Sequence, residues 1–183
     1  MGSYLNPGSK GFQESLNSEI YVDKTGLIEK TNAVLDTRQK FLCVSRPRRF
    51  GKSMAADMLA AYYERGEDAD LLFRSLKISK AESYRAHLNQ YDVIKVNIQE
   101  FLSMTGSMDE MLSMLKKYLV FDLMEHFDNV RFRDESNLIQ VMKDIYAKTK
   151  RAFVILIDEW DCLFREYPVS YTHLRAHETV LDL

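Results

Sequence analysis

A basic, glycine-containing segment offers the clearest chemistry in this sequence. Residues 45–53 read Ser-Arg-Pro-Arg-Arg-Phe-Gly-Lys-Ser, and the closing Gly51-Lys52-Ser53 is typical of a loop that binds phosphate. In such a loop, backbone N–H groups and the start of the following helix point at an anion. Lys52 would then contact the β- and γ-phosphates, and the Ser53 hydroxyl would be a ligand of Mg²⁺.

This segment departs from the usual phosphate-loop pattern at two positions. Arg46 stands where the pattern has its first glycine, and Pro47 removes one backbone N–H from the loop. Gly-Lys-Ser also occurs by chance in loops, so the alternative is a basic surface loop before a helix. The candidate nucleotide-binding residues are Pro47, Arg48, Arg49, Phe50, Gly51, Lys52 and Ser53.

An acidic pair later in the chain adds to this interpretation. The apolar run Phe153–Ile157 ends in Asp158 and Glu159, and open α/β sheets place their ligand sites at the carboxyl ends of parallel strands. Asp158 would hold Mg²⁺, usually through water, and Glu159 would polarise the water that attacks the γ-phosphate. The alternative is a capped strand end followed by a helix near Trp160. The two motifs together favour nucleotide binding more than either does alone.

Both motifs require strands and a helix to position them. Phe41–Val44 predicts a short buried strand, and Lys52–Arg65, with apolar residues at helical spacing, predicts a helix. Asp92–Ile98 predicts a second strand, and the continuous apolar run Phe153–Ile157 predicts a strand covered on both faces. Polar residues at the exit of the second strand are distant site candidates, with an ordinary strand end as the alternative: Asn97, Gln99 and Glu100.

Hydroxyl residues mark two further helix starts. Ser107 is followed three residues later by Glu110, which is capping-box spacing. Ser136 precedes an apolar stripe at helical spacing and is a candidate cap for another helix.

The motifs resemble those of the AAA-ATPase-like family of bacterial P-loop proteins. The residues that carry the resemblance are Tyr21–Ile28, Ser45–Ser53 and Leu156–Asp161, within a similarity that runs from about Tyr4 to Tyr167. The resemblance implies an α/β fold, namely a P-loop NTPase-type three-layer sandwich with a mostly parallel sheet, and it implies ATP and Mg²⁺ as cofactors. Arg46 is typical of the family, which tolerates the missing glycine.

The family also suggests what surrounds the site. The lead-in Tyr21–Thr25 lies near the nucleotide by resemblance, or alternatively only braces the sheet. Family members often carry a C-terminal PD-(D/E)XK nuclease-like domain, which makes nucleic acid a possible partner of the whole protein. Residues 169–183 resemble a translated sequencing adapter, so we expect residues 1–168 to be an incomplete, C-terminally truncated P-loop domain. Without its inserted strand and later sensor or finger residues, this chain should be unstable and hydrolyse ATP weakly or not at all.

Bulk composition is that of an ordinary globular protein. Apolar residues make up 46% and charged residues 28% of the 183 residues, and the net charge is −2, so nothing global suggests nucleic-acid or membrane binding. Cys43 and Cys162 are the only cysteines, and we expect both to be reduced core thiols of a cytoplasmic protein, with a disulfide between them as the alternative.

Three functional hypotheses follow from the sequence. The leading one is the ATP-binding domain of an ATPase. The second is a switch or scaffold that binds ATP without hydrolysing it. The third is a nucleic-acid-binding module that places Arg46, Arg48, Arg49 and Lys52 on phosphates. The oligomeric state, and the choice between ATP and GTP, stay open.

Overall fold

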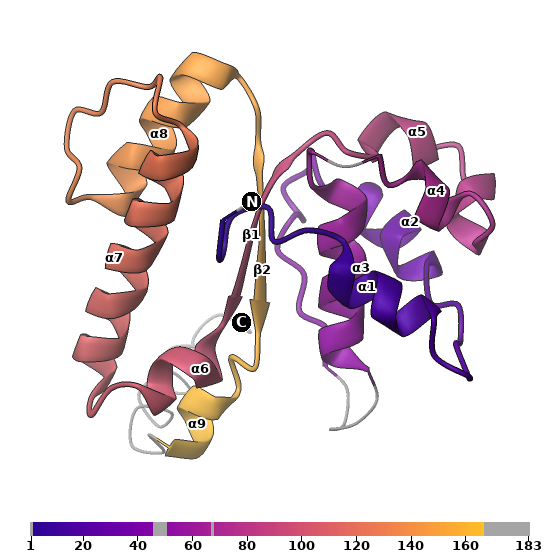
Figure 1. The fold of residues 1–183 in the computed structure, drawn as a ribbon, viewed down its shortest axis with the longest axis horizontal. Coiled ribbons are helices and arrows are strands. Elements are labelled where there is room, and N and C mark those ends of the chain that lie inside the picture. The colour runs from indigo at the N-terminus through magenta and orange to yellow at the C-terminus, as the bar shows by residue number, and fades with distance from the viewer. Residues whose placement is uncertain (1, 46–50, 67, 167–183) are drawn as a thin grey trace, which may run out of the picture.

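The computed structural model describes residues 2–45, 51–66 and 68–166 (Figure 1). The predicted nucleotide-binding residues Pro47, Arg48, Arg49 and Phe50 lie outside the described residues, as does the segment 169–183.

A parallel pair of strands forms the centre of the described part. Strand β1, Asp92–Asn97, pairs in parallel with β2, Phe153–Asp158, so that Asn97 lies beside Asp158. Both strands therefore end at the same edge. The predicted α/β class is confirmed, and both strands lie where the sequence predicts them. The larger three-layer sandwich stays a prediction, because the described sheet has two strands.

The N-terminal residues occupy the other edge of β1. Leu5 forms an antiparallel bridge with Ile94, and Lys95 N–H donates to the Tyr4 carbonyl at 2.9 Å. The carboxylate of Asp122 fixes this segment from the far side, since it accepts backbone N–H groups from residues 3, 4 and 5 at 2.7–3.1 Å. β1 thus has a neighbour on both edges.

One face of the sheet packs against helices from the first half of the chain (Figure 1). Val93 and Val154 contribute to this core together with Phe12 and Tyr62. The elements on this side are α1 (Lys10–Leu16), α2 (Gly26–Asn32), α3 (Lys52–Tyr63), α4 (Asp70–Phe73), η1 (Lys77–Lys80) and α5 (Tyr84–His87).

Buried tyrosine hydroxyls connect α3 to its neighbours. Tyr63 donates to the Asn32 side chain at 2.7 Å, and Tyr62 donates to the Tyr84 carbonyl at 2.7 Å. Burial raises the pKa of both phenols, so they stay neutral and keep these hydrogen bonds at neutral pH. The network fixes the C-terminal half of α3, and thereby the direction in which its N-terminus points.

The opposite face of β1 packs against α6 (Ile98–Ser103), α7 (Met108–His126) and α8 (Leu138–Thr149). Ser107 caps α7 as predicted, because its hydroxyl accepts the Glu110 N–H at 3.3 Å. The prediction for Ser136 is wrong. Asn137 caps α8 instead, through an amide oxygen that accepts two backbone N–H groups.

The predicted strand Phe41–Val44 is not formed. The segment is irregular, Phe41 is 88% exposed, and Cys43 is exposed rather than in the core. Among the described residues, no backbone hydrogen bond joins residues 41–45 to a strand. A strand needs such a partner, so the apolar run alone does not produce one.

The prediction that β2 is covered on both faces is also wrong. Val154 and Asp158 are buried beside α3, whereas Ile155 and Ile157 on the other face are 52% and 54% exposed. Helices α6 to α8 pack against β1 on that face, and these two side chains of β2 remain exposed to solvent. The described part therefore presents an apolar surface and a free strand edge beside it.

Candidate functional site

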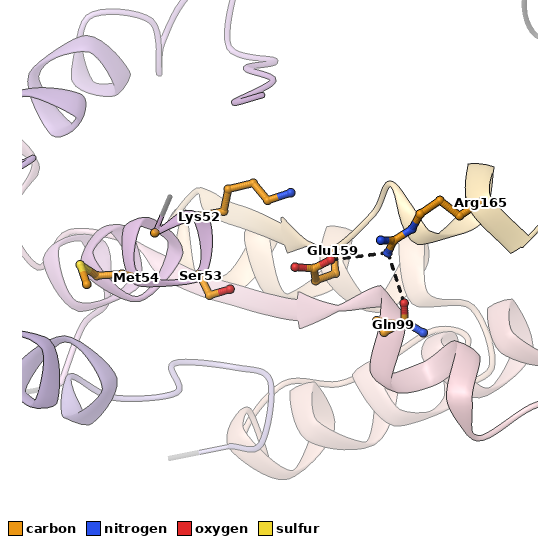
Figure 2. A pocket seen from close by; sticks show the side chains of 7 residues that line it. Lys52, Ser53, Met54, Gln99, Glu159 and Arg165 are labelled. Atoms are coloured by element: carbon orange, nitrogen blue, oxygen red, sulfur yellow. Dashed lines mark hydrogen bonds and ion pairs between the residues drawn. The ribbon is translucent and has the colours of Figure 1, made fainter. Parts of the chain in front are cut away.

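A cavity of about 580 Å³ lies at the carboxyl end of the sheet. It brings together the start of α3 and the segments that follow β1 and β2 (Figure 2). Seven residues line it, namely Gly51, Lys52, Ser53, Met54, Gln99, Glu159 and Arg165. The two motifs that the sequence singled out are thus neighbours in space, although they are far apart along the chain.

Gly51 forms the corner between the basic loop and α3. Its φ of +77° lies in the left-handed region, where a side chain is strained. A Cβ atom there would also lie 3.2 Å from Lys24 Nζ. That ammonium is the end of a flexible side chain and can shift, so the backbone conformation is what favours glycine at this position.

Lys52 and Ser53 open α3 and face the cavity. The Lys52 ammonium lies 3.8 Å from Asp161 Oδ1, in the segment after β2. Ser53 is exposed, so its hydroxyl is accessible to a ligand. Lys52 therefore reaches the acidic segment that follows β2, and Asp161 is a partner to which the sequence assigns no role.

Glu159 and Asp158 take different positions. Glu159 lines the cavity, and its backbone has a φ of +52°, an unusual value for a residue with a side chain. Asp158 is 8% exposed, and its Oδ1 accepts the Glu159 N–H at 2.9 Å. Its carboxylate is not among the groups that line the cavity. The local hydrogen bond fixes the turn that directs Glu159 toward α3.

Arg165 is the residue that the sequence analysis missed. It belongs to α9 (Cys162–Glu166), and its Nη2 lies 3.7 Å from Glu159 Oε2 and donates to Gln99 Oε1 at 3.4 Å (Figure 2). Gln99 was a distant candidate, and it does line the cavity, whereas Asn97 and Glu100 do not. Asn97 instead caps α6 through the Gln99 N–H. No local sequence pattern marks Arg165, which lies in a short helix after the end of β2.

The donor set fits a hard cation. Ser53 and Glu159 supply oxygen atoms at the cavity itself, whereas the buried Asp158 carboxylate lies outside its lining. Mg²⁺ prefers oxygen ligands and usually takes one or two carboxylates together with waters and phosphate oxygens. In the part of the chain that the structure describes, no cluster of three or more His, Cys, Asp or Glu forms a ready-made metal site.

A second cavity, of about 300 Å³, lies on the other side of Gly51 and Lys52. Three further lysines line it, namely Lys24, Lys30 and Lys77, and Lys24 belongs to the lead-in Tyr21–Thr25. The lead-in therefore does touch the phosphate-loop region.

The same lead-in also braces the fold, through Asp23. Its carboxylate accepts the Thr25 N–H and hydroxyl and the Lys77 N–H at 2.6–2.9 Å, which joins α2 to η1. Burial alone would raise the pKa of Asp23, but hydrogen bonds from Thr25 and Lys77 and the Lys77 charge outweigh it and lower the pKa from 3.8.

Replacing Asp23 with asparagine is expected to lower the free energy of unfolding by about 1–2 kcal/mol at pH 7. Because the folded-state pKa is lowered, the stabilisation is present above about pH 4 and is lost as the pH falls further. Urea unfolding at pH 7 and pH 3 measures the difference. Asp134→Asn is the matched control, since Asp134 accepts the same two groups from Ser136 but no distant N–H. An equal effect of both variants, or one that persists at pH 3, would contradict this role.

The fold and the cavity together describe an α/β protein in which the helix start at Gly51, Lys52 and Ser53 shares a cavity with an acidic strand end. Residues 8–179 match the model of the AAA-ATPase-like family, described as a predicted AAA-ATPase. The chain therefore belongs to this family, and the resemblance seen in its motifs is confirmed. Membership implies a P-loop fold and the use of a nucleotide, typically with Mg²⁺. The match runs into the segment 169–183, whose origin in an adapter stays a prediction.

A curated relative is an uncharacterized protein in the vnfD 5′ region of Azotobacter chroococcum mcd 1. It is 26% identical over 146 residues, which cover 77% of this chain. The chain spans about a quarter of that relative's length, with 25% covered. No solved structure matches the chain significantly. Within the described residues, every helix is too short or too polar to cross a membrane.

Proposed function

We propose that this chain is the ATP-binding core of an ATPase and that the 580 Å³ cavity receives the phosphates of Mg²⁺-ATP. The supporting observation is that Lys52 and Ser53 at the start of α3 and Glu159 at the end of β2 line one cavity. In the proposal, the Lys52 ammonium and the N-terminus of α3 bind phosphate. The Ser53 hydroxyl is an oxygen ligand for Mg²⁺, and the Glu159 carboxylate binds the attacking water.

Each side chain has one task in this proposal. The Lys52 ammonium binds β- and γ-phosphate oxygens and leaves its long contact with Asp161, 3.8 Å away. Ser53 would be a direct ligand of Mg²⁺, and Asp158, which does not line the cavity, would hold the cation through water. When bound, the cation would neutralise charge on the phosphates. Glu159 orients a water and accepts its proton as that water attacks the γ-phosphate. Such a transfer depends on positioning and charge more than on covalent chemistry by the protein.

Calorimetric titration of the 183-residue chain with Mg²⁺-ATP tests the proposal. Lys52→Ala is expected to weaken binding by about 30-fold, because a lost charge-assisted contact costs about 2 kcal/mol. Lys117→Ala, which removes an exposed lysine from α7, is the control and should leave the affinity unchanged.

A folded chain without Lys52-dependent binding would refute the proposal. Binding of oligonucleotides that falls steeply with salt and needs no Mg²⁺ would favour the nucleic-acid hypothesis instead.

A further inference from the structure

Arg165 is the one guanidinium that lines the cavity among the described residues. It enters from α9, on the side opposite α3, as Figure 2 shows. The cavity thus has two cations, Lys52 and Arg165, on facing walls.

The contacts of Arg165 are long for a charged group. Charge-assisted hydrogen bonds between a cation and an oxygen usually measure about 2.7–2.9 Å. Here Nη2 lies 3.7 Å from Glu159 and 3.4 Å from Gln99, and both contacts use the same nitrogen. An arginine guanidinium has five N–H donors in one plane. Because both contacts are long and use one nitrogen, a stronger acceptor can compete for the guanidinium.

A terminal phosphate is such an acceptor. It has about two negative charges and three oxygens, against one charge on Glu159, and the guanidinium fork matches phosphate geometry. The side chain of Arg165 is 35% exposed, so a ligand can reach it without opening the core.

We propose that Arg165 binds the γ-phosphate of the nucleoside triphosphate and thereby distinguishes ATP from ADP. This inference rests on the proposed function. In the structure, Arg165 contacts the Glu159 carboxylate and the Gln99 amide. When the triphosphate enters, the guanidinium moves to the γ-phosphate and releases Glu159 to orient water. The chain then supplies from α9 a cation that senses the third phosphate.

The test is the ratio of ADP to ATP dissociation constants, measured with Mg²⁺ on the 183-residue chain. Arg165→Ala is expected to weaken ATP binding about 10-fold and ADP binding less than twofold. Lys52→Ala is expected to weaken both, since Lys52 also contacts the β-phosphate. Arg131→Ala removes an exposed arginine between α7 and α8 and should change neither.

A second variant keeps the test decisive if Arg165→Ala unfolds. Arg165→Lys keeps the charge but loses the fork, and it should weaken ATP binding about threefold with ADP binding unchanged. An unchanged ADP-to-ATP ratio in both variants, beside Lys52-dependent binding, overturns the role of Arg165 alone. If the unmodified folded chain binds neither ATP nor ADP, both the proposed function and the role of Arg165 fail.

Discussion

Replacing Glu159 with glutamine is expected to lower ATP hydrolysis about 100-fold, while Mg²⁺-ATP affinity stays within about threefold of that of the unmodified chain. The amide has nearly the same shape as the carboxylate but cannot accept a proton from water. Glu159 lines the cavity through a strained turn at the end of β2, so the change leaves the phosphate-binding residues in place. Because we expect slow hydrolysis, the assay uses single-turnover conditions with protein in excess of labelled ATP.

Glu100→Gln is the matched control for this measurement. Glu100 lies in the first turn of α6, near the same end of the sheet, but it does not line the cavity. Its replacement should leave both turnover and affinity unchanged. A different outcome would be that the unmodified chain binds Mg²⁺-ATP but hydrolyses it no faster than Glu159→Gln does. The switch hypothesis would then replace the ATPase hypothesis.

Replacing Asp122 with alanine is expected to have the largest effect on stability, about 3 kcal/mol in the free energy of unfolding. The Asp122 carboxylate is 6% exposed and accepts three backbone N–H groups from residues 3–5. A hydrogen bond to a charged acceptor is worth about 1.5–3 kcal/mol, and three bonds that share one carboxylate do not add in full. Without them Leu5, 1% exposed, loses its support in the core.

Urea unfolding measures this effect, and amide exchange locates it. The N–H groups of Leu5 and Lys95 should exchange faster in Asp122→Ala, because the N-terminal segment leaves the edge of β1. Glu125→Ala, at an exposed position on the same helix, should change stability by less than about 0.5 kcal/mol. A loss below about 1 kcal/mol for Asp122→Ala would show that the edge pairing holds the segment by itself.

Local patterns predicted the elements that carry the site. Apolar residues at helical spacing located α3, and apolar runs located β1 and β2, because these signals depend on neighbouring residues only. The Ser107 cap was predictable for the same reason. The Ser136 cap was not, since Asn137 is an equally good cap one residue later and the choice depends on where α8 begins.

Long-range pairing was the part that the sequence did not reveal. The pattern at residues 41–44 suits a buried strand, but a strand forms only where a partner offers hydrogen bonds. Similarly, the apolar run of β2 does not tell whether helices cover both faces, and Ile155 is exposed because they do not. The exposed apolar groups are a reason to expect aggregation, and that prediction awaits a measurement.

The candidate site was predictable in outline. Glycine, lysine and serine at a helix start and an acidic pair at a strand end each have a recognisable local signature. Their meeting in one cavity depends on the parallel pairing of β1 and β2, which brings strand ends to one edge. Arg165 has no such signature, since an arginine on a short helix is usually a surface residue.

A crystal structure of the chain with Mg²⁺ and a non-hydrolysable ATP analogue tests the central claim most directly. We expect the β- and γ-phosphates within hydrogen-bond distance of the Gly51 N–H and Lys52 Nζ, and the cation beside Ser53 Oγ. We also expect Arg165 on the γ-phosphate rather than on Glu159. A nucleotide seated among Lys24, Lys30 and Lys77, or elsewhere on the chain, would contradict the assignment of the cavity.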